Sequence, residues 1–226
     1  MLLLRTRSLL QYVSDLHLER GFKRSIKPRK PFLLLGGDIG YPKQENYKNF
    51  LLDISADFDK VFILSGNHEY DKFKDVNIID NEIENICAAR NNLFFLQKKT
   101  HTLCDKYNIE IAGCTLWSSF PKSKREYHLD HVNWLTNLVN NNTINKSFVI
   151  ATHHCPHEYC ISEYQNKPKY NPKYFASNQT EIIRNPKVIK WIYGHSHLNS
   201  DIVLFNKHLV NNQYGYYKTP LNGYKS

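Results

Sequence analysis

Short apolar runs that stop at small or polar residues constrain the fold of this chain more than any other feature. Each run is about five residues long, which is the length of a buried β-strand. Five such runs cover residues 9–13, 32–35, 61–64, 148–151 and 188–193. Segments with helical patterning lie between several of them, at 44–56, 73–90, 127–141 and 178–186. Strands that alternate with helices in this way predict an α/β domain with a mostly parallel central sheet.

Two further pairs of short strands surround turn-like residues. The segments 101–104 and 108–114 flank Asp105 and Lys106 and predict a hairpin. The segment 199–210 predicts two more strands around Asn206 and Lys207. The chain has 226 residues, no internal repeat and no Gly/Ser-rich linker. We therefore predict a single domain over residues 1–226.

The charge of the chain is strongly positive. Lys and Arg outnumber Asp and Glu by 30 to 21, which gives a net charge of +9. A positive surface attracts anionic partners such as phosphates or nucleic acid. Lys, Asn and Tyr are abundant throughout the sequence, so a general bias in composition explains the charge equally well.

The cysteines and the apolar segments indicate the compartment. Five cysteines are scattered without a CxxC pair, which favours reduced thiols in an intracellular protein over a disulfide framework. Arg5 and Arg7 interrupt the apolar N-terminus too early for a signal peptide. No apolar run approaches the roughly 20 residues that span a bilayer. We expect a soluble cytoplasmic protein with no membrane partner, and its oligomeric state stays open.

Side chains of the kind that bind metals follow the carboxyl end of each of the five apolar runs. The parallel strands of an open α/β sheet end along one edge, and ligand sites form there. Asp15 and His17 are two residues apart, so at a strand end both side chains are expected to project to the same side. The complete series is Asp15-x-His17, Gly37-Asp38, Gly66-Asn67-His68-Glu69, His153 and Gly194-His195-x-His197.

The series as a whole predicts two metal ions. A single motif of this kind is more often a polar residue satisfied at a strand end, but five together are not explained in that way. Imidazole nitrogens mixed with carboxylate and amide oxygens suit Mn²⁺, Fe or Zn²⁺ better than Ca²⁺ or Mg²⁺ alone. Seven ligands exceed the needs of one tetrahedral site and suit two metals that share a bridge. Such a pair, about 3.5–4 Å apart, activates a water at neutral pH and neutralises phosphoryl oxygens.

The ordered motifs resemble those of the calcineurin-like metallophosphoesterase superfamily. The stretches 14–19, 113–117, 152–156, 175–177 and 212–216 are similar to those of a small single-domain bacterial-type branch, and the resemblance runs from about residue 8 to 216. The resemblance implies an α/β fold with four layers, an αββα sandwich that contains two mixed β-sheets and outer helices.

The resemblance also implies a role for each site residue. One metal would be held by Asp15, His17 and His197, and the other by Asn67, His153 and His195. Asp38 would bridge the two metals. His68 matches a histidine that does not bind metal, and it would protonate the leaving oxygen or stabilise the charge on the phosphate. Every ligand position is filled, which argues against a metal-free scaffold.

The function expected from these residues is metal-dependent phosphoester hydrolysis. The nucleophile would be a hydroxide held between two divalent ions, with Mn²⁺ expected first and Fe or Zn²⁺ as alternatives. The length leaves no room for the extra domain or cap of some nuclease relatives, which favours a small phosphodiester or a nucleotide as substrate. Two alternatives stay open: a nuclease that acts on nucleic acid, and a non-catalytic scaffold with the same fold.

Several other residues are assigned structural roles. We expect His154 to support the site without binding metal, and Cys155 and Trp117 to belong to the core. His157 lies on the loop after His153, where a surface position is favoured over contact with the substrate. The other histidines lack ligand spacing and are expected at the surface or half-buried: His101, His128, His131 and His208. Two basic segments follow metal-ligand motifs, 23–30 and the Tyr- and Lys-rich 159–174. The second would suit stacked bases and phosphates, although a solvated loop is slightly favoured.

Overall fold

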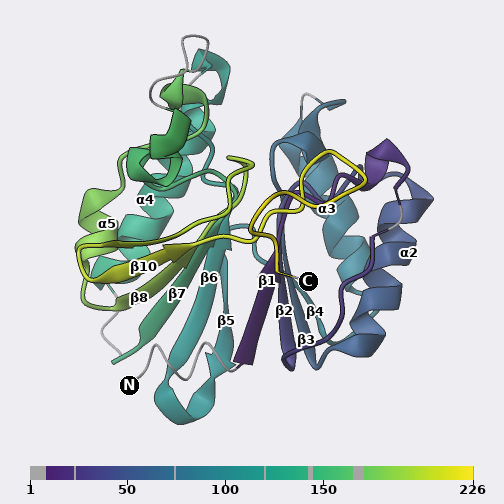
Figure 1. Ribbon diagram of the computed structural model, residues 1–226. Helices are drawn as coiled ribbons and strands as arrows, with labels where there is room; N and C mark the ends of the chain where they lie inside the picture. The colour runs from purple at the N-terminus through teal and green to yellow at the C-terminus, as the bar shows by residue number, and fades with distance from the viewer. Residues whose placement is uncertain are drawn as a thin grey trace.

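Two β-sheets packed face to face, each covered by helices on its outer side, make up the fold in a computed structural model (Figure 1). The structure describes residues 9–22, 24–73, 75–119, 121–141, 145–164 and 171–225. The first sheet has the strand order β1-β2-β3-β4, and the second has the order β5-β6-β7-β8-β10-β9.

The four strands of the first sheet are all parallel. They are β1 (Leu10–Val13), β2 (Phe32–Gly36), β3 (Lys60–Leu64) and β4 (Leu93–Phe95). Two helices cover its outer face, α2 (Glu45–Ile54) and α3 (Val76–Cys87). Parallel neighbours need a crossover, which α2 provides between β2 and β3 and α3 between β3 and β4.

The second sheet is mixed. Its strands are β5 (Lys99–Cys104), β6 (Ile109–Cys114), β7 (Ser147–Thr152), β8 (Val188–Ile192), β9 (Asp201–Leu204) and β10 (Lys207–Val210). The central strands are parallel, while β5 and β9 pair antiparallel at the edges. Two helices cover its outer face, α4 (Arg125–Asn141) and α5 (Thr180–Arg184). Short 3₁₀ turns lie at Leu18–Arg20, Ser55–Asp57, His68–Tyr70, Asp105–Tyr107, Lys122–Lys124, Glu158–Tyr164 and Pro172–Tyr174.

The apolar runs are continuous because the central strands are buried on both faces. Leu34 and Phe62 point into the layer between the sheets, while Leu33 and Ile63 point toward α2 and α3. On β7, Val149 lies in the same inner layer. A strand covered on both sides gains from an apolar residue at every position, so the usual alternation with polar residues disappears.

The predicted αββα sandwich is confirmed. Each expected strand and helix is present, with ends that differ by a few residues. Two details differ from expectation. The first sheet is parallel throughout instead of mixed, and the three-residue strand β4 follows α3. Three residues carry too little pattern to be distinguished from the end of a helix.

The C-terminal segment joins the two sheets above the ends of the strands, and it is yellow in Figure 1. After β10 it pairs with the residues that follow β1: the backbone N–H groups of Tyr214 and Gly215 donate to the carbonyl oxygens of Ser14 and Asp15 at 2.9 and 2.8 Å. The buried guanidinium of Arg24 donates to the carbonyl oxygens of Leu16 (2.8 Å) and Tyr217 (3.0 Å). Arg24 belongs to the basic segment 23–30, but its side chain faces inward and fixes the C-terminal segment. Within the described ranges, no helix has both the length and the apolar character needed to cross a membrane.

The inner layer should dominate stability. Leu34 is fully buried between the sheets, and Leu34→Ala leaves a cavity there, so we expect it to lower the free energy of unfolding by about 2–5 kcal/mol. Leu129→Ala is the matched control, since Leu129 lies exposed on α4 and its loss should cost less than about 0.5 kcal/mol. Urea titrations followed by circular dichroism measure both. Equal losses would show that the inner layer is not the core.

Candidate metal centre

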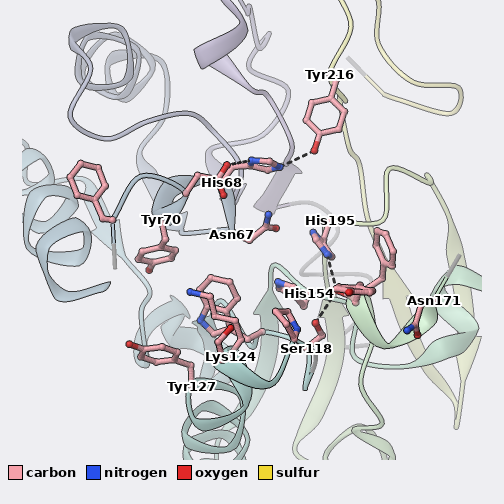
Figure 2. A pocket seen from close by; sticks show the side chains of 17 residues that line it. Asn67, His68, Tyr70, Ser118, Lys124, Tyr127, His154, Asn171, His195 and Tyr216 are labelled. Atoms are coloured by element: carbon pink, nitrogen blue, oxygen red, sulfur yellow. Dashed lines mark hydrogen bonds and ion pairs between the residues drawn. The ribbon is translucent and has the colours of Figure 1, made fainter. Parts of the chain in front are cut away.

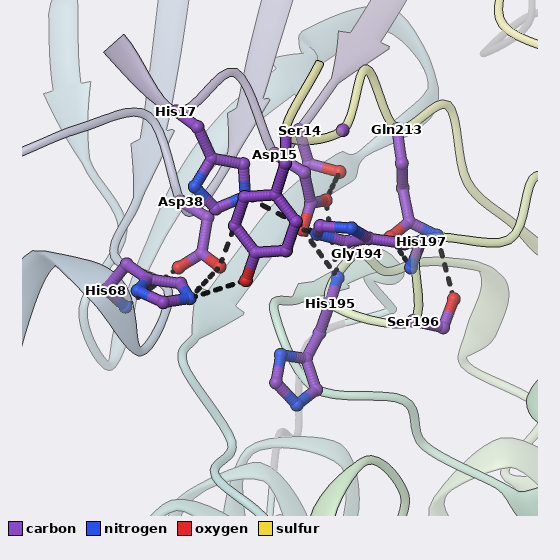
Figure 3. Close-up of polar contacts among 12 residues, drawn as sticks. Ser14, Asp15, His17, Asp38, His68, Gly194, His195, Ser196, His197 and Gln213 are labelled. Atoms are coloured by element: carbon purple, nitrogen blue, oxygen red, sulfur yellow. Dashed lines mark hydrogen bonds and ion pairs between the residues drawn. The ribbon is translucent and has the colours of Figure 1, made fainter. Parts of the chain in front are cut away.

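Asp15, His17 and His197 form the first of three groups of possible ligand atoms that lie within 4.8 Å of one another. Asp15 and His17 follow β1, and His197 follows β8 (Figure 3). The imidazole Nε2 of His197 lies 3.2 Å from Oδ1 of Asp15 and 3.4 Å from Nε2 of His17. The carboxylate of Glu19 lies 2.9 Å from Nδ1 of His17. With Nδ1–H donated to that carboxylate, Nε2 of His17 keeps the lone pair that binds a metal.

The backbone brings these side chains together in a way that the strand pattern did not predict. Asp15 (φ 59°) and His17 (φ 49°) are both in the left-handed region, as are His195 (φ 68°) and His197 (φ 52°). The extended backbone behind the expectation for Asp15 and His17 is therefore absent, although both side chains reach the same group of ligand atoms. Left-handed conformations are costly for residues with a Cβ and persist where the surroundings enforce them, typically at functional sites.

Asp38 lies at the centre of the arrangement and is almost completely buried. Its Oδ2 is 3.3 Å from Nε2 of His153 and 3.9 Å from Nε2 of both His17 and His68. Its Oδ1 accepts the backbone N–H of His68 at 2.9 Å. Burial by itself raises the pKa of a carboxyl group, but His153, His68 and His17 outweigh it and hold the pKa of Asp38 well below its usual range. The carboxylate is thus ionised where it faces two groups of histidines.

His153 and His195 complete a second group with Asp38, and the third group combines His17, Asp38 and His68. Nδ1 of His153 lies 2.9 Å from the carbonyl oxygen of Gly36, and its Nε2 lies 3.2 Å from Oδ1 of Asn67. Burial lowers the pKa of His153, but Asp38 raises it to about 9. Burial and His153 together lower the pKa of His195 to about 4. Nε2 of His195 lies 3.2 Å from the carbonyl oxygen of Tyr174, so Nδ1 is the nitrogen that remains for a metal.

The spacing of these atoms fits metal ions. Side-chain atoms that bind one ion at about 2.0–2.2 Å lie roughly 3.0–3.6 Å from one another. The distances from Nε2 of His197 to Asp15 and His17, and from Nε2 of His153 to Asp38 and Asn67, fall between 3.2 and 3.4 Å. All seven residues predicted as ligands are brought to one place, and Asp38 lies between the two groups.

Two glycines and one glutamate hold the turns around Asp38. A Cβ on Gly66 would lie 2.1 Å from Oδ1 of Asp38, and Gly37 has a φ of +89° beside the ring of His153. The buried carboxylate of Glu69 accepts the backbone N–H groups of Ile39 (2.7 Å), Gly66 (2.7 Å) and Asp38 (3.1 Å). Burial and Asp38 raise the pKa of Glu69 to about 8, while these N–H donors favour the ionised form. Glu69 therefore ties the end of β2 to the end of β3.

His68 lies at the rim of the centre and has its own hydrogen-bond partners. Its Nδ1 is 2.5 Å from the carboxylate of Asp71, and its Nε2 is 2.8 Å from the hydroxyl of Tyr216. Burial lowers the pKa of His68, but Asp71 and Asp38 raise it to about 9. In the arrangement of Figure 2, His68 and Tyr216 lie above Asn67 at one end of a cavity.

Three residues of the site were given no role from the sequence, although two of them, Gln213 and Tyr216, lie in the stretch 212–216 that carries part of the family resemblance. Asp71 orients His68. Tyr216 contacts His68 through its hydroxyl, and its ring centroid lies 4.1 Å from that of His17. The buried side chain of Gln213 accepts the backbone N–H of His197 at 2.7 Å and donates to Ser196. Asp71 follows the His68 motif by three residues, which is a detectable signal. Tyr216 and Gln213 lie far from their partners in sequence and follow no spacing rule.

A cavity of about 900 Å³ opens beside the centre (Figure 2). Asn67, His68 and His195 line the end that meets the candidate metal ligands. Aromatic side chains make up much of the remaining wall: Tyr70, Phe73, Trp117, Tyr127, Tyr174, Phe175 and Tyr216. Lys124 and Asp71 are its charged residues.

The expected surface position of three histidines is wrong. His128, His131 and His157 are buried. Nδ1 of His131 accepts the backbone N–H of Leu116 at 3.0 Å, and Nδ1 of His128 lies 2.9 Å from the carbonyl oxygen of Trp117. These contacts hold the turn after β6, where Leu116 (φ 67°) and Trp117 (φ 49°) are left-handed. Burial lowers the pKa of His131 to about 4, which keeps it neutral.

The structure describes the positions expected for His154, Trp117 and Cys155, and part of the two basic segments. His154 is buried between the rings of Trp117 and His195, and neither of its nitrogens has a hydrogen-bond partner among the described residues. Trp117 and Cys155 are buried in the core, as expected. Of the two basic segments, Lys23, Lys167 and Lys169 lie outside the described residues.

Comparisons with known proteins agree with this geometry. The family model for calcineurin-like phosphoesterases matches residues 10–199. An uncharacterized protein of Acanthamoeba polyphaga mimivirus is 28% identical over an alignment 261 positions long, which covers 92% of this chain and 91% of that protein.

Solved structures show the same fold at low sequence identity. The phosphopantetheinyl hydrolase PptH from Mycobacterium tuberculosis superimposes with a TM-score of 0.70 at 14% identity, covering 92% of this chain and 89% of that one. A dimetal phosphatase from Danio rerio gives a TM-score of 0.55 at 13% identity, covering 93% and 88%. With the family model spanning most of the sequence and the His/Asp clusters assembled at the strand ends, this chain belongs to the calcineurin-like phosphoesterase family and is a metal-dependent phosphoric ester hydrolase.

Proposed function

We propose that this protein hydrolyses a small phosphodiester or a nucleotide with two divalent metal ions, Mn²⁺ being the first expectation and Fe or Zn²⁺ the alternatives. The observation that carries the proposal is the position of the Asp38 carboxylate between two groups of ligand atoms. Asp15, His17 and His197 would hold one metal, and Asn67, His153 and His195 the other. Asp38 would contact both. We propose a single catalytic domain over residues 1–226.

The protein's own groups would bind and orient the substrate and move its protons. When bound, two metal ions supply a water nucleophile at neutral pH and neutralise charge on the phosphoryl oxygens. His68 is the group at the rim with a nitrogen directed away from its carboxylate partner. With Nδ1–H donated to Asp71, Nε2 is placed to give a proton to the leaving oxygen or to stabilise charge on the phosphate. The hydroxyl of Tyr216 lies 2.8 Å from this nitrogen and marks where a substrate oxygen would lie.

The two other functions are less well supported. A non-catalytic scaffold does not require seven ligand residues to converge on one place. A nuclease would use a basic and aromatic groove, and part of the segment expected to form it, residues 165–170, lies outside the described residues. A cavity of about 900 Å³ is within the size range of small-molecule sites, which favours a small substrate.

Metal content tests the proposal directly. We expect about two transition-metal ions per chain by elemental analysis, and hydrolysis of a chromogenic phosphodiester that is lost to a chelator and restored by Mn²⁺. Because the metals bind only the folded chain, the chelator should also lower the melting temperature. Clean protein that contains no metal and hydrolyses no ester under any metal supplement would favour the scaffold.

Substitutions at Asp38 and His68 should have different effects. Asp38→Ala removes the carboxylate shared by both groups, so it should reduce metal content and cost more activity than any other single ligand change. His68→Gln should keep both metals and lower kcat by about 10²–10⁴-fold, as expected for a lost proton donor.

The matched control for His68→Gln is His208→Gln. His208 also contacts an aspartate, Asp201 at 2.8 Å, but it lies on β10 and does not line the cavity. It should keep both metal content and kcat. If His68→Gln emptied the metal sites, His68 would be a ligand and its proposed role would be wrong.

A further inference from the structure

We infer that the aromatic cavity beside the metal centre is a nucleoside subsite, which binds the base of a nucleoside phosphoester whose phosphate lies at the metals. The inference rests on the proposed hydrolysis of a phosphoester and adds the class of its organic group. It concerns the part of the cavity beyond Asn67, His68 and His195, which is lined mainly by aromatic residues that are not candidate metal ligands.

The position of the cavity fits an organic group attached to a phosphate. One end is lined by Asn67, His68 and His195, so a phosphoryl group held at the centre has its ester oxygen directed toward the cavity. The volume of about 900 Å³ far exceeds the space needed by a phosphate alone. A substrate with a sizeable organic group would fill it.

A continuous series of ring contacts lines the cavity from its far end to the metal centre. The ring centroids are 6.4 Å apart for Tyr127 and Trp117, 5.6 Å for Trp117 and His154, and 4.0 Å for His154 and His195. The series continues to Phe175, whose ring is tilted relative to that of His195, with the two ring centroids 5.1 Å apart. Trp117 and His154 are nearly buried and form the floor, whereas Tyr127 and Phe175 are partly exposed and form walls. Flat walls of this kind bind flat rings by stacking.

Polar groups among the rings favour a base over an aliphatic chain. The ammonium of Lys124 lies 4.3 Å from the ring centroid of Trp117 and 5.5 Å from that of Tyr127. It offers N–H donors at the aromatic end of the cavity, where the carbonyl oxygens and ring nitrogens of a base would accept them. Ser118 and Asn171 add hydroxyl and amide groups to the lining. An acyl chain would offer no acceptor to the Lys124 ammonium, which opposes its entry.

A pair of matched esters tests the subsite by activity. Adenosine 5′-(methyl phosphate) and ribose 5-(methyl phosphate) share the phosphodiester and the sugar and differ only in the base. We expect kcat/KM, measured by ³¹P NMR with Mn²⁺ present, to be about tenfold or more higher for the adenosine ester, as one stacked base contributes. Equal values for the two esters would overturn the subsite.

Substitutions locate the effect in the cavity. Lys124→Met and Tyr127→Leu should each reduce the ratio of the two kcat/KM values by about threefold or more. Lys122→Met is the control for charge, because Lys122 is exposed two residues away and does not line the cavity. Tyr159→Leu is the control for an exposed tyrosine elsewhere. Both controls should keep the ratio, and a ratio that falls equally in controls and cavity variants would contradict the assignment.

Binding without turnover separates this inference from the proposed function. In chelator-treated protein, adenosine should quench tryptophan fluorescence and ribose should not, and Trp117→Phe, verified as folded by circular dichroism, should remove the response. Quenching by adenosine without hydrolysis of any ester would support the subsite and reject the proposed function. Hydrolysis of both esters at the same rate, with no quenching, would support the proposed function and reject the subsite.

A short single-stranded oligonucleotide serves as a competitor of adenosine. If it competes, with a log–log salt slope of its affinity near −0.7 per phosphate contact, the base that binds in the cavity would belong to a nucleic acid end instead of a free nucleotide.

Discussion

The buried carboxylate of Asp38 is the constraint on which the rest of the site depends. A carboxylate that is 1% exposed is costly unless donors or cations surround it. Here the backbone N–H of His68 donates to one oxygen, and three imidazoles approach the other within 3.9 Å. To leave room for it, the adjoining turn has no Cβ at Gly66, and Glu69 ties the ends of β2 and β3 together.

The electrostatics of the site follow from this one carboxylate and its neighbours. His153 gains from Asp38, which raises its pKa to about 9, while His195 is placed next to His153 and is held neutral, with a pKa of about 4. Imidazoles packed so closely cannot all carry protons. Divalent cations would bind the lone pairs that face one another, and they would balance the carboxylates at the same time. The separation of the donors by 3.2–3.4 Å fits that role.

The connection between the two sheets makes the site depend on tertiary structure. Each sheet contributes candidate ligands, so the groups of ligand atoms form only when the two sheets are packed in their native positions. The C-terminal segment helps to hold the two sheets in these positions, since it pairs with Ser14 and Asp15 and is held by Arg24. It also places Tyr216 over His17 and Gln213 beneath His197. The same packing leaves the aromatic cavity open next to His195.

Alternating strands and helices, and the residues that converge on the site, could be predicted from local features, namely continuous apolar runs and the polar motifs directly after them. The division into two sheets of an αββα sandwich was implied only by the resemblance of the ordered motifs to a known family. Asp15, Asp38 and Asn67 follow strands of the first sheet, and His153 and His195 follow strands of the second. Their approach follows from the packing of the two sheets. Only the tertiary structure decided the left-handed backbone at Asp15 and His17, the burial of His128 and His131, and the contact between His68 and Tyr216, which are 148 residues apart. These features arise from packing between segments distant in sequence, and such contacts leave no periodic pattern in the chain.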